Sequence, residues 1–251
     1  IPIRADVDSL RLTFALPNAH STLPFETGLD GQLRLYDLDM TLGTGIDGIV
    51  VQGINGVVRL APSTVSDTGG GLSGALSGVS LDLFGQPLEG IDATFVADAH
   101  HLAVGALRST LHGGLVRSAR PDAPGIDYLL PGPEAPEGRL AADLVFENVD
   151  VYTFLEHGGW QNPPYTGAAK GALVLERLDG SKVLDAQGHG TLQLDRADLG
   201  VVPLFTAIYA QLPASDRPRF DGLACTWKVK DRTVDFERFD QRNDVFRRSW
   251  W

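Results

Sequence analysis

Apolar and polar side chains alternate along the segment from Gly188 to Phe246, and this alternation constrains the fold more than any other feature of the sequence. After two glycines, Leu192 and Leu194 alternate with Gln193 and Asp195. Further on, one phase of a predicted hairpin holds Leu223, Cys225, Trp227 and Val229. A period of two is typical of strands with one dry face and one wet face. Both strands therefore need a cover over their apolar face.

Between that strand and the hairpin, residues 201–212 have the spacing of a short amphipathic helix. Pro203 is compatible only with the first turn of this helix, and Pro213 is compatible with its C-terminal end. The helix positions expected to cap an apolar face are Leu204, Phe205, Ile208, Tyr209 and Leu212. Burial of four or five such side chains is worth roughly 1.5 to 3 kcal/mol each, so we expect this helix to dock on the sheet.

The earlier part of the chain predicts a series of short strands, each bounded by Gly, Asp, Asn or Pro. Apolar residues occupy odd positions at Leu33 and Leu35 but even positions at Leu38, Met40 and Leu42. This change of phase predicts a bulge or a bend. A mainly β protein built on an antiparallel meander sheet is the most economical interpretation.

Prolines mark the best internal boundary. Five of them fall in the segment 119–138, where they forbid ladder pairing at most positions. We therefore predict an N-terminal β section at 1–120, a proline-rich linker or surface loop at 121–138, and a C-terminal β section at 139–251 that includes the helix. The alternative is that both sections form one continuous groove.

The C-terminal quarter of the chain carries a recognisable order of residues: a glycine-flanked strand, a short helix that begins with Pro-Leu-Phe, and a hairpin. It is carried by Gly188, Gly190, Leu192, Leu194, Ala197, Leu199, Pro203, Leu204, Phe205, Ile208, Phe220, Leu223, Val229, Asp231, Val234, Phe236 and Phe239. This order resembles the C-terminal part of the AsmA-like family, which includes the TamB-type envelope proteins. Looser similarity at residues 88–118 and 138–159 extends the resemblance over most of residues 75–246.

The resemblance implies an elongated, curved sheet that forms a groove with an apolar interior, a β-taco-like fold. It implies a section of a bridge-like protein that passes phospholipid across a diderm bacterial envelope and serves outer-membrane biogenesis. The implied location is the periplasm or cell envelope, with a parent chain anchored in a membrane by a segment absent from this sequence, and with envelope proteins as partners. The chain departs from the family at Arg247–Trp251, where another strand is expected. We therefore expect a portion of a longer chain, or altered ends.

Charge argues against a nucleic-acid partner. The sequence has 32 acidic and 21 basic side chains, a formal net charge of −11, which would repel polyphosphate chains.

The single cysteine, Cys225, lies on the apolar phase of a predicted strand, where a buried inert thiol is expected rather than a nucleophile or a metal ligand.

Motifs that carry chemistry are weak throughout. A GxGxxG pattern at residues 43–48 precedes a glycine-broken apolar run without a helix to hold a pyrophosphate. His100 and His101 are neighbours that would point to opposite faces of a strand, and Asp37 and Asp39 lack the further oxygen ligands of a calcium loop. We therefore expect no catalytic residues, no metal, no cofactor and no enzymatic activity.

Two hypotheses of different class remain. In the first, the inward phase of many strands forms a groove for phospholipid or another acyl lipid. Its candidate lining residues are Leu12, Phe14, Leu144, Phe146, Leu173, Leu175, Leu192, Leu194, Trp227 and Val229. In the second, the chain is a structural or protein-interaction β module whose core is closed by its own side chains, without space for a ligand.

Overall fold

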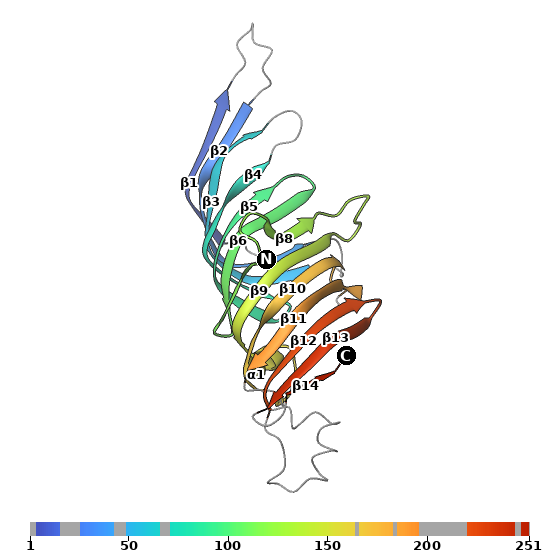
Figure 1. Cartoon of the computed structure of the whole chain (residues 1–251). Helices are drawn as coiled ribbons and strands as arrows, with labels where there is room; N and C mark the ends of the chain where they lie inside the picture. Colours follow the sequence, from blue (N-terminus) through green and yellow to red (C-terminus); the bar gives the residue numbers. More distant parts are fainter. Residues whose placement is uncertain are drawn as a thin grey trace.

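The computed structural model describes residues 4–15, 26–42, 49–65, 71–163, 166–182, 185–195, 220–243 and 247–250. These residues form one antiparallel sheet of fourteen strands and one short helix (Figure 1). The strands are β1 (Arg4–Ala15), β2 (Glu26–Leu42), β3 (Ile49–Val65), β4 (Leu72–Leu83), β5 (Gln86–Ala97), β6 (His101–Leu111), β7 (Gly114–Ser118), β8 (Pro124–Leu129), β9 (Arg139–Asp150), β10 (Ala168–Asp179), β11 (Gln187–Asp195), β12 (Phe220–Lys230), β13 (Thr233–Asn243) and β14 (Arg247–Trp250). The helix is α1 (Val151–His157).

The sheet is a meander in which each strand pairs with its neighbours in the sequence, with one variation. The position between β6 and β9 is filled by two short strands, because β7 pairs with one half of each neighbour and β8 with the other half. The predicted mainly β, antiparallel meander fold is confirmed. The segment 121–138 departs from the predicted linker or loop, since it contains β8. Pro124 opens that strand, a position where proline is tolerated.

Bulges bend the first strands near their middle. The register between β2 and β3 shifts between Leu35 and Leu38, where Asp37 has a φ of 47°. Side chains satisfy the backbone at this bend: Gly53 N–H donates to Asp39 Oδ1 over 2.9 Å, and Asp37 N–H donates to Asn55 Oδ1 over 3.0 Å. The bulge predicted from the change of phase is confirmed, and Asp39 binds backbone at this bend.

The largest core cluster is built by strands of the N-terminal half together with β8 and β9. It joins side chains of β2 to β6 with those of β8 and β9, and Ile49 and Tyr128 are its most deeply buried members, each 1 % exposed. The described residues form one sheet and one short helix, so the apolar side chains of this cluster are covered mostly by other strands of the same sheet.

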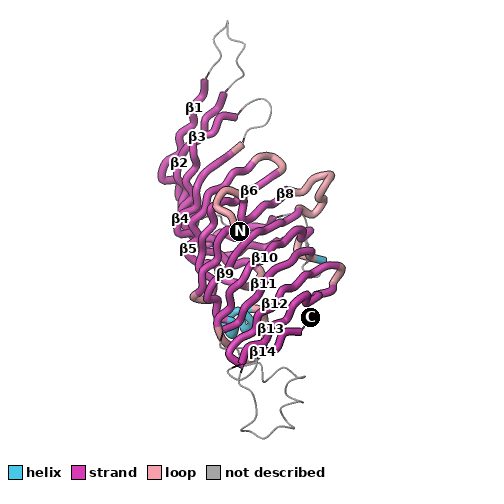
Figure 2. Tube along the Cα trace, viewed as in Figure 1, coloured by secondary structure: helices cyan, strands magenta, loops and turns pink. Residues whose placement is uncertain are grey.

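Helix α1 follows β9 and lies at one end of the strands β9 to β12 (Figure 2). Asp150 caps it, since its carboxylate accepts a hydrogen bond from Thr153 N–H over 2.8 Å. The predicted helix at 201–212, with its capping residues Leu204, Phe205, Ile208, Tyr209 and Leu212, lies outside the described residues. Within the described ranges, no helix is long and apolar enough to span a membrane.

Candidate functional site

The strands β9 to β13 present one face on which apolar side chains follow one another from strand to strand; we call it the β9–β13 apolar face. Residues that pair across antiparallel strands share a face, so the register defines its rows. The central row is Leu144, Leu173, Gly190, Trp227 and Phe236. The rows on either side of it are Phe146, Gly171, Leu192 and Cys225, and Ala142, Leu175, Gly188, Val229 and Val234. A fourth row is Val149, Ala169, Leu194 and Leu223.

The opposite face of the same strands is predominantly polar. Its ion pairs join neighbouring strands: Lys170 Nζ lies 3.2 Å from Asp195 Oδ2, and His189 Nδ1 lies 3.2 Å from Glu176 Oε1. Lys228 and Lys230 also lie on this face of β12, as the alternation predicted. The two faces therefore differ sharply in polarity, and only one of them can hold an apolar ligand.

Glycines make room for aromatic rings on the apolar face. A Cβ at Gly190 would lie 2.8 Å from Trp227 Cζ2, and a Cβ at Gly171 would lie 2.9 Å from Phe146 Cζ. Real Cβ atoms essentially never come so close to another atom. Each ring thus occupies space above a glycine of the adjacent strand, and that space would be lost with any larger residue.

Burial changes along this face. Its fourth row is closed: Leu194 and Leu223 are buried in a cluster with Val151 of α1, and Leu155 of α1 packs against that cluster. In the central row and the two rows beside it, the side chains of β9 to β12 are half-buried, except for the buried Cys225. At β13, Val234 is 54 % exposed and Phe236 is 61 % exposed. The face is therefore covered at the end near α1 and open toward β13.

The structure brings eight of the ten predicted lining residues onto this one face. They are Leu144, Phe146, Leu173, Leu175, Leu192, Leu194, Trp227 and Val229. Leu194 differs from the others because it is buried in the closed row. The backbone of Leu12 pairs with Leu29 and that of Phe14 with Thr27, while their side chains lie outside the described residues.

Sequence reasoning missed two exposed members of the face, Val234 and Phe236. Their alternation in the hairpin was visible, and pairing with Val229 and Trp227 would have placed them on the apolar side. It also missed α1 as the cover of the closed row. Val151 to Phe154 are β-branched or aromatic residues, which favour a strand when only local preference is considered.

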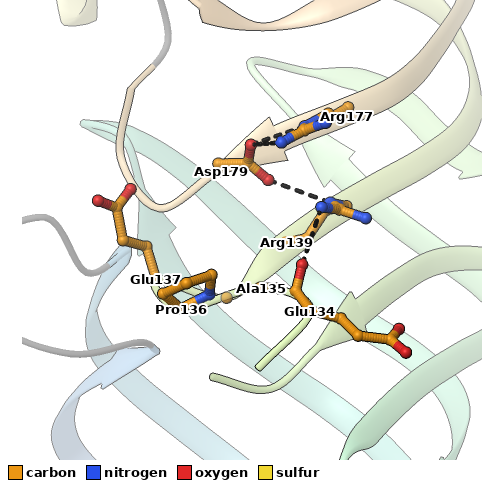
Figure 3. A pocket seen from close by; sticks show the side chains of 8 residues that line it. Glu134, Ala135, Pro136, Glu137, Arg139, Arg177 and Asp179 are labelled. Carbon is orange, nitrogen blue, oxygen red and sulfur yellow. Dashed lines mark hydrogen bonds and ion pairs between the residues drawn. The ribbon is translucent and has the colours of Figure 1, made fainter. Parts of the chain in front are cut away.

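A second feature is a polar hollow of about 210 Å³ between the turn at Glu134–Gly138 and the ends of β9 and β10 (Figure 3). Asp179 joins two arginines there: Arg139 Nε donates to its Oδ1 over 3.1 Å and Arg177 Nε to its Oδ2 over 2.6 Å. Burial raises the pKa of Asp179, but the hydrogen bonds from Arg177 and Arg139 outweigh burial and hold that pKa below its usual value. The hydrogen bond between Arg139 and Asp179 ties β9 to β10.

Groups with catalytic or metal-binding chemistry are sparse. Cys225 is buried as predicted, and burial raises the pKa of its thiol, which keeps it protonated. His101 contacts Asp127 across β6 and β8. In the part of the chain that the structure describes, no cluster of three or more His, Cys, Asp or Glu side chains has a metal-binding arrangement.

In comparisons with known proteins, no family model, no curated protein and no solved structure matches this chain. The resemblance to the AsmA-like family stays a prediction from the sequence.

Proposed function

We propose that the β9–β13 apolar face holds the acyl chains of phospholipid or another acyl lipid, and that the protein is a non-enzymatic section of a lipid-conducting groove. One observation carries the proposal: the central row of this face and the two rows beside it are apolar from β9 to β13, and their side chains other than Cys225 remain half-buried or exposed. Contiguous apolar surface left open to water is typical of a binding surface. The AsmA-like resemblance supplies the setting, a diderm envelope with the periplasm as location, outer-membrane biogenesis as process, and envelope proteins as further partners.

The chemistry of the face suits passive movement. Each methylene that leaves water contributes about 0.8 kcal/mol, so the affinity for an acyl chain rises with the number of methylenes that the face covers. The central row carries leucine, glycine and aromatic side chains and no hydrogen-bonding group except the Trp227 indole N–H. An acyl chain therefore meets similar surroundings at successive positions and can shift along the face without breaking specific contacts.

A second candidate is a structural β module with a closed core. The buried cluster around Ile49 and Tyr128 favours it, because these side chains pack against one another as an ordinary closed core does. The two candidates make opposite predictions for the C-terminal half: either lipid occupies its open rows or they stay free.

Native mass spectrometry of the purified protein distinguishes them. We expect the protein released from the bacterial envelope fraction to retain phospholipid, seen as adducts with the mass of a phospholipid that collisional activation removes. Protein purified in parallel with added detergent-solubilised phospholipid is the positive control. Protein that remains free of lipid in both preparations would support the closed module and defeat the groove.

A further inference from the structure

Two histidines meet where α1 approaches the turn between β6 and β7. The ring centres of His112 and His157 lie 4.7 Å apart with an angle of 44° between their planes. His112 occupies a two-residue turn with a φ of 45°, followed by Gly113 with a φ of 76°. Its carbonyl accepts a hydrogen bond from Asp150 N–H at the start of α1 over 3.3 Å. The turn is therefore anchored to the helix that carries the second histidine.

The hydrogen bonds around these rings define which nitrogen carries the proton. Gln86 Nε2 donates to the Phe154 carbonyl over 3.2 Å, which leaves Gln86 Oε1 facing His112 Nε2 at 2.7 Å. Since an amide oxygen only accepts, His112 Nε2 must be the protonated nitrogen. His157 Nδ1 likewise donates to the Thr153 carbonyl over 3.0 Å. In the neutral rings, His112 Nδ1 and His157 Nε2 are left with free lone pairs.

This arrangement matches the support that metal-binding histidines have in proteins. Such a histidine almost always donates its second ring N–H to a carbonyl or carboxylate, which fixes its tautomer and orientation. Both His112 and His157 do so. Zinc–nitrogen bonds of about 2.0–2.1 Å at a tetrahedral angle place two ligand nitrogens roughly 3.3 Å apart and their ring centres about 5 Å apart. The observed separation of 4.7 Å is close to that value.

We propose that His112 and His157 form a two-histidine site for a borderline divalent cation such as Zn²⁺, which clamps α1 to the β6–β7 turn. The carboxylates of Asp150 and Glu89 act electrostatically on His112 and add negative charge beside the cation. Water completes the coordination, because the described residues place no third His, Cys, Asp or Glu in position to bind. The clamp holds the helix that covers the closed row of the apolar face, whether or not that face binds lipid.

Calorimetric titration of the intact protein with ZnCl₂ alone, in a buffer that does not bind metal, tests the site. We expect saturable binding of one Zn²⁺ per chain and a rise of the melting temperature with Zn²⁺. His157→Gln removes an exposed ring, and His112→Asn removes the other while keeping a residue that tolerates positive φ. Each variant should weaken binding at least tenfold. His189→Gln, which changes an exposed histidine of β11, should bind as the unchanged protein does.

A second measurement keeps the test informative if one variant folds poorly. Nitrogen-15 NMR of the histidine rings should show Zn²⁺-dependent shifts at His112 Nδ1 and His157 Nε2 and none at His189. Absence of saturable binding, or binding that His157→Gln leaves unchanged in folded protein, would overturn the proposal. Binding lost only in His189→Gln would assign the metal to a different surface and would equally refute the clamp.

Discussion

The Trp227 indole lies so close to Gly190 of the neighbouring strand that a Cβ on that glycine would come within 2.8 Å of Cζ2 of the ring. Phe146 stands in the same relation to Gly171. Both pairs belong to the β9–β13 apolar face. A glycine inside a strand weakens it, so its presence here is explained by the close approach of a ring and of a backbone carbonyl oxygen of the next strand. In each pair, the aromatic ring lies in the space that a side chain on the glycine would otherwise occupy.

Gly190→Ala should therefore displace Trp227 and destabilise the protein by about 1–3 kcal/mol, the usual cost of overpacking. The Ala172 carbonyl oxygen, 2.3 Å from the same Cβ position, adds to the clash. Urea unfolding followed by tryptophan fluorescence measures both the free energy of unfolding and the change around the indole. His189→Ala, one residue earlier on the opposite face, should change stability by less than about 0.5 kcal/mol. Equal effects of the two substitutions would contradict the role given to Gly190.

Leu173→Arg should abolish photo-cross-linking to a phospholipid that carries a diazirine in its acyl chain. Leu173 is half-buried in the central row, so a charge there would have to lose its hydration whenever a chain occupied the face. Val174→Arg is the matched control, because it introduces the same charge one residue later on the polar face, opposite Asp143 and His189. Loss of cross-linking in both folded variants, or in neither, would argue against lipid on this face.

Local patterns predicted much of the sheet and of its apolar face. The alternation at Leu192 and Trp227 placed them on the correct side, and the change of phase near Leu35 marked the bulge at Asp37. What such patterns lack is information on contacts between residues far apart in the sequence. Tyr128 belongs to a proline-rich segment, and it becomes a core residue only because β8 pairs with both β6 and β9.

The sequence predicts a cover of the apolar face at residues 201–212, which lie outside the described residues; within the described residues, α1 covers the closed row. The seven residues of α1 are too few to favour a helix by themselves, so their helical state depends on tertiary packing and on the Asp150 cap. A sequence pattern evaluated over a window of helical length does not capture that dependence.

Leu194→Ala should cost about 2–5 kcal/mol of stability, because Leu194 is 7 % exposed in the cluster that α1 covers. Leu173→Ala should cost roughly half as much or less, since water already reaches that side chain. Urea unfolding of the two variants measures the difference. Because Leu194 is buried, Leu194→Arg should disrupt the packing of α1 on the closed row, so this variant cannot test lipid binding by itself. Equal costs for the two alanine variants would show that the face is covered evenly.

Asp179 should make stability depend on pH in the acid range. Burial raises the pKa of this carboxyl, but the hydrogen bonds from Arg177 and Arg139 together outweigh burial and hold the folded-state pKa below its usual value of 3.8. The unfolded chain therefore binds the proton more readily than the folded protein does. It follows that the stabilisation from Asp179 is complete above about pH 3.8 and is lost as pH falls through the lower folded-state pKa.

Asp179→Asn isolates this contribution from that of the other carboxylates. The variant keeps the size of the side chain but cannot accept the two charge-assisted hydrogen bonds as a carboxylate does. We expect it to be less stable than the unchanged protein at pH 6, and we expect the difference to shrink between pH 4 and pH 2 as Asp179 of the unchanged protein takes up its proton. Urea unfolding at a series of pH values measures both curves. Curves that stay parallel down to pH 2 would mean that the two arginines do not stabilise the charged form of Asp179, because the pH-dependent part of the difference comes only from the carboxylate.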